Sequence, residues 1–518
     1  EKFGYHFNLL DIGGGFTAFS ALETTFAKAA AVISKALQKY FPPELGVRII
    51  AEPDFDTCSS SIQFNNAIRM ERVEIVPNLS LQELIEKKTT AMDQQFKDDS
   101  FMLVNIGNII ERYREWKMRL PNVEPFYAVK CNNDPVLLRI LINLGVNFDC
   151  ASMQIYNTIY CANSSAIELQ GEMQLILDAG VHPDRIIYAN TIKAVSHLRF
   201  AKENNINHTV FDNEDELHKI KKYHPNAKLA LRICPDMKSC ESRFQLGIKF
   251  GAPERDVAHL LKVARSLSLD VMGVSFHVGS DCLNPIGYEK AIIASKKIFK
   301  LAEKFGYHFK ELDIGGGYTA FSTLEMTFEK AAVTISKALQ EHFPPESGVR
   351  IIAEPGRFFP TRAYTIVLNI IGKRVVRKGN NDPFDLEHEN AHLYENTSDI
   401  EKVLYYVNES VYGSIYFMTL DPTLIILKPV KKNTDGTTNA VLFGQTCDSL
   451  DLLLNECSLP KLNAGDWIYF EEVGAYSLVL ATEFNSFKKP KCFYYIQEEF
   501  WNEIQGKIDL PFDFYNMS

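Results

Sequence analysis

The sequence has little that would point to a membrane, a secretory route or a metal site. No apolar run approaches the length of a membrane span, and the first residues, Glu1-Lys2-Phe3-Gly4, do not form a basic and then apolar leader. The ten cysteines include no Cys-x-x-Cys pair. Scattered cysteines are typical of free thiols in a reducing compartment, not of a zinc site or a disulfide framework. We therefore expect a cytoplasmic protein without a bound metal or a membrane partner.

The sequence also lacks an excess of basic residues. Its 65 acidic residues outnumber its 55 lysines and arginines, which gives a net charge of −10. Nucleic-acid-binding proteins rely on positive charge, so nucleic acid is not expected as a partner. With 518 residues, of which 46% are hydrophobic, the chain is long enough for two or more globular domains.

Residues 1–53 nearly repeat residues 303–355, with roughly four in five positions identical. The first copy continues as Asp54-Phe55 where the second continues as Gly356-Arg357, so it lacks the arginine. Two distant copies do not make a solenoid, which needs contiguous repeats. We interpret residues 1–69 as a displaced partial duplicate, dispensable or an artefact of gene assembly. A variant lacking them that could not fold would contradict this interpretation.

Strand-like and helix-like segments alternate from about residue 108 to residue 360. Strands are predicted at residues 125–130, 145–150, 185–190, 208–212, 228–233, 271–277, 310–314 and 349–353. Helices are predicted between them, as at residues 133–144, 193–205, 213–223, 254–267, 286–305 and 325–341. Eight such units predict an α/β protein with a (β/α)8 TIM barrel over residues 108–365. The later chain is β-rich, which predicts a C-terminal β domain over residues 366–518, with residues 70–107 packing against it.

Lys130 ends the first of these predicted strands, in the apolar segment Pro125–Asn132. A lysine at the end of a buried strand is partly desolvated, which lowers its pKa and frees the amine as a nucleophile. The alternative is a lysine that simply extends its amine into solvent.

Further polar groups fall where predicted barrel strands end, which is where the catalytic groups of such barrels gather. They are Asp149, Arg232, His277, the run Gly315–Gly317, Glu354 and Arg357. Each has a structural alternative: a tight glycine turn, a core histidine, a surface ion pair. Together, however, they supply an amine for a Schiff base, an anion for a ring nitrogen, a stacking face and a phosphate cradle. Pyridoxal phosphate requires these four features.

These motifs, with Gly444–Asp448 and Gly474–Tyr476, resemble those of the ornithine decarboxylases, which are eukaryotic pyridoxal-phosphate enzymes with an alanine-racemase-like fold, and their antizyme-inhibitor relatives. The resemblance runs from about Met70 to about Trp501. It implies that Lys130 forms the Schiff base, that Glu354 holds the ring nitrogen and that His277 stacks on the ring. The phosphate would be bound by Ser280, Gly315, Gly316, Gly317, Arg357 and Tyr476. Supporting polar residues would be Asp149, Glu172 and Arg232.

The resemblance also implies a substrate site shared between two subunits of a homodimer. Cys447 would lie over the substrate carbon and direct its protonation after carbon dioxide leaves, and Asp421 and Asp448 would bind the distal amine. The implied activity is decarboxylation of L-ornithine to putrescine, in polyamine biosynthesis. Leu420 stands where the family carries tyrosine, so another amino acid such as leucine or lysine is an alternative substrate.

A catalytically inactive regulator that binds antizyme is the alternative function, although retention of Lys130 and Asp149 favours an enzyme. The segment Asn190–Glu214 resembles the family's antizyme-binding region, with Lys193 and Arg199 as basic contacts or as parts of an ordinary exposed helix. Met153–Leu169 is an extra stretch that could displace Asp149 or crowd the cofactor. Retained non-coding sequence is the alternative origin of that stretch.

Overall fold

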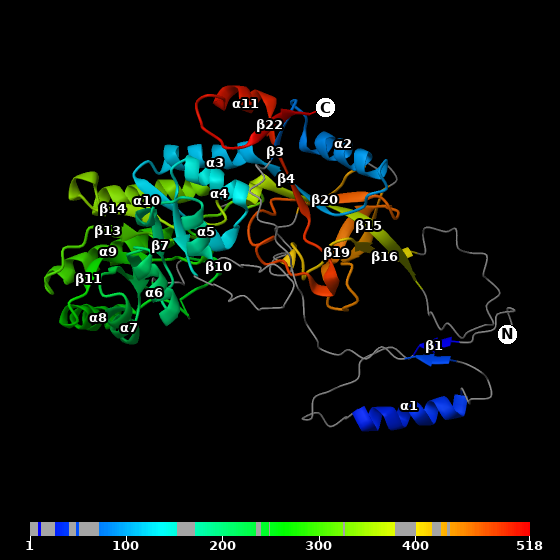
Figure 1. Ribbon diagram of the computed structural model, residues 1–518, viewed down its shortest axis with the longest axis horizontal. Coiled ribbons are helices and arrows are strands. Elements are labelled where there is room, and N and C mark those ends of the chain that lie inside the picture. Colours follow the sequence, from blue (N-terminus) through cyan, green and yellow to red (C-terminus); the bar gives the residue numbers. More distant parts are fainter. Residues whose placement is uncertain are drawn as a thin grey trace. The chain divides into compact units, whose positions relative to one another are not determined.

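The protein was analysed as a computed structural model, which describes residues 9–11, 26–40, 48–50, 72–152, 171–234, 240–247, 249–324, 327–378, 400–416, 426–431 and 436–517. The chain divides into two compact units, residues Glu1–Ile62 and Gln63–Ser518. Figure 1 draws both. None of the helices in these described ranges is long and apolar enough to cross a membrane.

The described residues of the first unit form one β-α-β element. Strands β1 (Leu9–Asp11) and β2 (Arg48–Ile50) pair in parallel, and α1 (Phe26–Tyr40) lies between them in the chain. The same order and register recur in the second unit, where β13 (Glu311–Asp313) pairs with β14 (Arg350–Ala353) around α10 (Phe328–His342). The repeated sequence therefore forms a repeated structure.

Eight parallel strands close a barrel in the second unit, which confirms the predicted fold class. In order around the barrel they are β5 (Val123–Ala128), β6 (Asn147–Cys150), β7 (Ile186–Tyr188), β8 (His208–Phe211), β9 (Lys228–Ile233), β11 (Asp270–Phe276), β13 and β14. Strand β14 pairs with β5 and completes the circle. All eight predicted strands are present, shifted at their ends by a few residues.

Helices follow the barrel strands and surround them (Figure 1). They are α4 (Pro135–Asn143), α5 (Glu172–Asp178), α6 (Val195–Glu203), α7 (Glu214–Tyr223), α8 (Glu254–Ser266), α9 (Ile286–Glu303) and α10, while α3 (Ile106–Arg119) precedes β5. Local sequence sets their ends. The side chain of Asp134 accepts a hydrogen bond from the Val136 N–H and Pro135 begins α4, which is a favourable helix start.

The inside of the barrel carries an apolar layer. Its side chains come from alternate positions of the strands and contact one another: Phe126, Ile187, Ala189, Val210, Ala230 and Ile352. Neighbouring strand positions, such as Tyr127, Phe148 and Leu229, belong instead to the large core shared with the surrounding helices. This alternation leaves the polar ends of the strands as the place for a site.

The β domain combines both ends of the second unit in one ten-stranded sheet. Its strands are β3 (Arg72–Val76), β4 (Phe101–Asn105), β15 (Tyr364–Arg377), β16 (Ile400–Val407), β17 (Ile426–Pro429), β18 (Thr437–Phe443), β19 (Leu452–Pro460), β20 (Trp467–Glu471), β21 (Lys491–Gln497) and β22 (Asp513–Asn516). Strand β4 lies between β15 and β21, so residues 101–105 belong to the sheet. Helices α2 (Leu81–Asp93) and α11 (Glu498–Ile504) accompany it.

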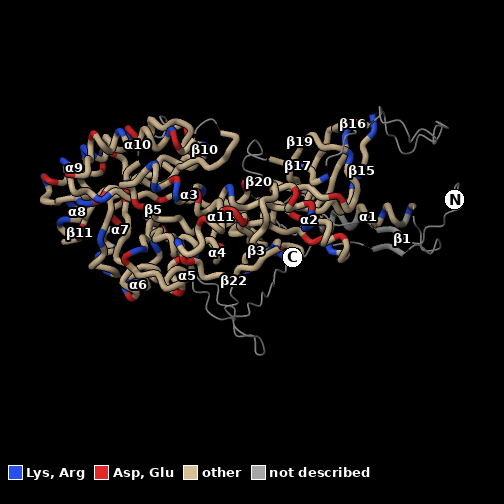
Figure 2. The backbone as a smooth tube through the Cα atoms, turned by 90° about the horizontal axis from the view of Figure 1, so that it is seen from above, with Lys and Arg blue, Asp and Glu red and all other residues tan. Residues whose placement is uncertain are grey.

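Charged residues of both signs are interspersed over the barrel helices and the β domain (Figure 2). The acidic excess of the sequence is therefore not gathered into one strongly charged face in that view. Such a surface gives no sign of binding a polyanion.

Candidate active site

A pocket opens at the carboxyl ends of the barrel strands. It is lined by Ala128, Lys130, His277, Ser280, Gly316, Gly317, Tyr318, Glu354, Gly356, Arg357 and Tyr476. Tyr476 comes from the β domain, and its N–H donates to the Cys131 carbonyl oxygen at 2.8 Å. The pocket therefore brings together most of the residues that the sequence singled out, from segments more than 300 positions apart.

Lys130 lies just beyond the strand in which it was predicted. Strand β5 ends at Ala128, and a single 3-10 turn, Val129–Cys131, follows. The turn points the Lys130 side chain at β6, where its Nζ lies 2.7 Å from Oδ2 of the fully buried Asp149. The Lys130 side chain is 45% exposed and lines the pocket.

The prediction that Lys130 has a lowered pKa is wrong for this arrangement. Burial by itself would lower the pKa, but the negative charge of Asp149 and its hydrogen bond outweigh it and raise the pKa above its ordinary value. Lys130 is therefore protonated, and its ammonium group is stabilised by the Asp149 carboxylate. It must lose a proton before it can act as a nucleophile.

The extra stretch in the sequence does not displace Asp149. Residues 153–170 lie outside the described residues, but both sides of the stretch are held together. The Met173 N–H donates to the Ser152 carbonyl oxygen at 3.1 Å, and the Ala151 N–H donates to Glu172 Oε2 at 2.6 Å. Burial raises the pKa of Glu172 to about 7.

Glu354 follows β14 and is almost completely buried. Its Oε1 atom has no hydrogen-bond partner among the described residues. Burial raises the pKa of Glu354 well above the ordinary value, and the charges of Asp313 and Asp149 raise it further. The positive charge of buried Arg232 in β9 opposes this rise. A buried acceptor without a partner suits a ligand that presents an N–H group.

His277 follows β11 and is a neutral, fixed ring. Burial, Arg232 and Lys130 lower its pKa well below the ordinary value. The Gly279 N–H donates to its Nδ1 at 3.0 Å, so the proton of the neutral ring is on Nε2. An uncharged, oriented aromatic face can stack on a flat ligand.

The remaining part of the pocket suits an anion. The Nε atom of Arg357 donates to Ser280 Oγ at 3.1 Å, and its guanidinium lies 4.6 Å from the centre of the Tyr476 ring. Gly317 has φ of +107°, and a Cβ there would lie 2.5 Å from the Gly279 carbonyl oxygen. The backbone can therefore approach a ligand closely beside a cationic side chain, as phosphate sites require.

Three residues near this site were not singled out from the sequence: Asp281, Asp313 and Tyr318. Asp281 is buried and lies 3.6 Å from Arg357 Nε. Asp313 is a buried acid at the end of β13, and its place just before the glycine run Gly315–Gly317 was a usable sign. Nothing in the sequence showed where its side chain points.

Two predicted substrate residues do not line the pocket in this chain. Cys447 is exposed. The Tyr412 hydroxyl donates to Oδ2 of Asp448, and the Leu450 N–H donates to Oδ1 at 3.0 Å. The prediction for Asp421, and the departure at Leu420, lie outside the described residues.

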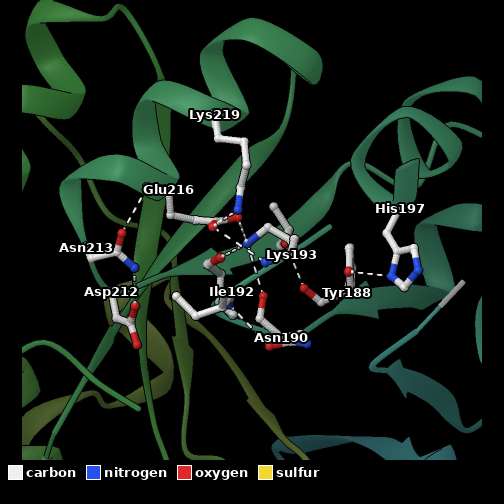
Figure 3. A network of polar contacts seen from close by, with 11 residues as sticks. Tyr188, Asn190, Ile192, Lys193, His197, Asp212, Asn213, Glu216 and Lys219 are labelled. Carbon is white, nitrogen blue, oxygen red and sulfur yellow. Dashed lines mark hydrogen bonds and ion pairs between the residues drawn. The ribbon is translucent and has the colours of Figure 1, made fainter. Parts of the chain in front are cut away.

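Lys193 was predicted as a surface contact, and this is wrong. Figure 3 shows its side chain inside a polar network, where Nζ donates to the carbonyl oxygens of Val210 at 2.6 Å and Asn190 at 3.0 Å. Nζ also lies 3.0 Å from Glu216 Oε1, and neither side chain is exposed by more than 1%. Burial lowers the pKa of Lys193 to about 8. Arg199 is exposed, as expected.

Comparison with known proteins agrees with this site. The family model for the pyridoxal binding domain of pyridoxal-dependent decarboxylases matches residues 1–54 and 106–361. Ornithine decarboxylase of Rattus norvegicus is 36% identical over 421 residues, 81% of this chain and 85% of the relative. Antizyme inhibitor 2 of Xenopus laevis is 37% identical over 426 residues, 82% and 87% of the two chains. The structure of Paramecium bursaria Chlorella virus arginine decarboxylase superposes with a TM-score of 0.68 and 35% identity, covering 80% of this chain and 100% of that chain.

The pocket fits pyridoxal phosphate, the cofactor of that family. The unpartnered Oε1 of Glu354 suits a protonated ring nitrogen, and the Arg357 side with its glycines suits a phosphate. Lys130 is the amine at the same pocket. When bound, the cofactor withdraws electrons from a substrate carbon.

Gly316→Ala should weaken cofactor binding at least about tenfold, or about 1.4 kcal/mol. A Cβ at Gly316 would lie 2.7 Å from His277 Nε2 and 2.8 Å from the Glu354 carbonyl oxygen, so both must move. Titration of the cofactor-free protein, followed by absorbance, measures the affinity. Gly372→Ala is the matched control, because a Cβ there meets nothing within 4 Å. Equal cofactor affinities in the two variants would contradict a role for the glycine run in binding the cofactor.

The barrel with its sheet domain, the pocket and the matches over most of the chain lead to one conclusion: the chain belongs to the family of pyridoxal-dependent decarboxylases.

Proposed function

We propose that the protein decarboxylates L-ornithine to putrescine and carbon dioxide, a reaction of polyamine biosynthesis, with pyridoxal phosphate held by Lys130. The observation that carries the proposal is the 2.7 Å contact between Lys130 and buried Asp149 in a pocket that Glu354 also lines. The similarity to Rattus norvegicus ornithine decarboxylase, 36% over most of both chains, supports the choice of substrate.

Lys130 and its neighbours would control one proton at the start of the reaction. Asp149 holds the ammonium form of Lys130, so the amine becomes reactive only when a base removes that proton. Glu172, whose pKa is raised to about 7 by burial, lies near enough to interact with Lys130 and Asp149 and could accept it.

Glu354, His277 and Arg357 would hold the cofactor. Glu354 would face the ring nitrogen and keep it charged, so that electrons can flow toward it. His277, neutral and fixed through Gly279, would stack on the ring without repelling that charge. Arg357, with Ser280, Gly315, Gly316, Gly317 and Tyr476, would bind the phosphate.

We further propose a homodimer with shared active sites. Cys447 is exposed and absent from the pocket of its own chain, so it is free to reach the pocket of another. Cys447 of the partner subunit would give a proton to the substrate α-carbon as carbon dioxide leaves. Asp421 and Asp448 would meet the distal amine, because two carboxylates favour a cationic end.

Purified protein supplied with pyridoxal phosphate should release carbon dioxide from ornithine much faster than from lysine, arginine or leucine. Two carboxylates near the distal end favour an amine, and ornithine matches the function of the curated relatives. Labelled carbon dioxide release from each amino acid is the measurement. Faster release from leucine or lysine would make that amino acid the substrate and would indicate that Leu420 changes the substrate preference.

Lys130→Ala and Cys447→Ala should each abolish activity alone, and a mixture that is dissociated and reassociated should recover about one quarter of the wild-type activity. Random pairing makes half of the dimers mixed, and each mixed dimer keeps one intact shared site. The assay is carbon dioxide release before and after mixing. A mixture as inactive as its components would contradict sharing between subunits.

A catalytically inactive regulator is the second candidate, because antizyme inhibitor 2 of Xenopus laevis is as similar as the enzymes are. The retained pair of Lys130 and Asp149 favours an enzyme. If the protein bound antizyme but took up no cofactor and released no carbon dioxide, the regulator would replace the enzyme. Arg199 remains an exposed candidate contact for antizyme, whereas Lys193 does not.

We place the reaction in the cytoplasm. Cys131, Cys150 and Cys447 are free thiols, as expected in a reducing compartment. Fractionation of cells tests this, and recovery of the protein mainly in organelles would contradict it.

A further inference from the structure

Asn132 lies two residues after Lys130, where the turn that carries the lysine meets the β domain. It is buried, and three of its polar atoms make hydrogen bonds. Its carbonyl oxygen accepts the Tyr127 hydroxyl at 2.7 Å, and its Oδ1 accepts the Asp134 N–H at 2.9 Å. Its Nδ2 donates to the Gly474 carbonyl oxygen at 2.8 Å. Because both ends of the side-chain amide are bonded, its orientation is fixed.

The two ends of this amide have different roles. The bond from the Asp134 N–H to Oδ1 is local, and it forms a turn that is common for asparagine before a helix such as α4. The bond from Nδ2 to Gly474 instead joins residues 342 positions apart in the chain. An ordinary turn therefore accounts for the oxygen of Asn132 but not for its nitrogen.

A second hydrogen bond runs beside the one from Nδ2. The Tyr476 N–H donates to the Cys131 carbonyl oxygen at 2.8 Å, so two bonds join residues 131–132 to residues 474–476. Tyr476 lines the pocket next to Arg357, on the side that suits a phosphate. Lys130 lies in the turn at the other end of this connection. The two bonds therefore link the amine of the pocket to its phosphate side.

The phosphate side has contacts of its own that do not depend on Asn132. The Gly474 N–H donates to the Thr361 carbonyl oxygen at 3.2 Å. A Cβ at Gly474 would overlap the Pro360 carbonyl oxygen, so the two backbones pack directly against each other. Loss of the Asn132 amide leaves these contacts in place. It removes one of the two bonds that hold the end of the Lys130 turn.

We propose that Asn132 is a positioning residue that sets the distance between the Lys130 amine and the phosphate side of the pocket. The inference rests on the proposed function, which assigns pyridoxal phosphate to this pocket. The aldehyde and the phosphate of the cofactor are attached to one rigid ring, so both ends are bound together only where the pocket has the matching spacing. The neutral Lys130 amine condenses with the aldehyde, which forms a C=N bond and releases one water. A displaced amine forms this bond less readily, whereas phosphate binding does not change.

Two variants of Asn132 test this role. Asn132→Asp keeps the shape and the oxygen that accepts the Asp134 N–H, but it loses the donor to Gly474. Asn132→Ser also loses that donor, keeps a hydroxyl that accepts in such turns, and adds no charge. Each variant should bind pyridoxal phosphate at least about tenfold more weakly than the wild type, because a buried carbonyl oxygen loses its partner.

A second ligand separates positioning from general disruption. The probe 4′-deoxypyridoxine 5′-phosphate has the ring and the phosphate but no aldehyde, so it cannot react with Lys130. Its affinity should change by less than about twofold in the Asn132 variants. Titration of the cofactor-free proteins, followed by absorbance, gives both affinities. An equal loss for the two ligands, or an unchanged affinity for pyridoxal phosphate, would overturn the proposal.

The neighbouring Asn133 provides the matched control, because it is exposed. Asn133→Asp and Asn133→Ser make the same chemical changes one residue further along and should alter neither affinity. A selective loss of pyridoxal phosphate binding in these variants as well would overturn a specific role for Asn132.

Tyr127→Phe decides the question if the Asn132 variants do not fold. It keeps the buried ring and removes only the hydroxyl that donates to the Asn132 carbonyl oxygen. It should weaken binding of pyridoxal phosphate more than binding of the probe, and an equal effect on both would overturn the proposal. Failure of the wild type to bind pyridoxal phosphate would refute the proposed function and the inference with it. An unchanged ratio of the two affinities in the variants would overturn the inference alone.

Discussion

The ion pair between Lys130 and Asp149 is the contact on which the rest of the site depends. Burying a carboxylate as completely as Asp149 is costly unless a cation compensates it, and Lys130 is the cation at 2.7 Å. The same contact holds the amine at the pocket and keeps it protonated. Reactivity therefore depends on moving a proton, not on a weakly basic lysine.

The barrel explains how such a site can be built from distant parts of the chain. Parallel strands bring their carboxyl ends to one face, so Lys130, Asp149, Arg232, His277 and Glu354 meet there although they span more than 200 positions. The apolar layer beneath them separates these charges from the other end of the barrel. The β domain then contributes Tyr476, through a hydrogen bond to the turn that carries Lys130.

Much of this arrangement could be predicted from the sequence, because the alternation of apolar strands and amphipathic helices is local. The predicted ends of strands were wrong where contacts with distant parts of the chain determine them. The strand that was predicted to contain Lys130 ends at Ala128, and the following turn is fixed by Tyr476 from the β domain. Periodicity carries no information about such a partner.

Side-chain electrostatics was harder to predict than the fold. The resemblance of its segment to an antizyme-binding region suggested Lys193 as a surface contact, yet three acceptors converge on Lys193 in the folded chain (Figure 3). The pKa of Lys130 has the opposite direction from the one expected of burial alone, because Asp149 and Glu354 are nearby. Asp313 was visible as an acid just before a glycine run, but its proximity to Glu354 depends on the register between β13 and β14.

The most direct measurement asks which lysine carries the cofactor. The protein, supplied with pyridoxal phosphate, is reduced with borohydride, digested and analysed by mass spectrometry. The account predicts a phosphopyridoxyl group on Lys130 and none on Lys193, a buried lysine whose pKa is lowered to about 8. A label on Lys193, or an unlabelled Lys130 after saturation with the cofactor, would contradict the account.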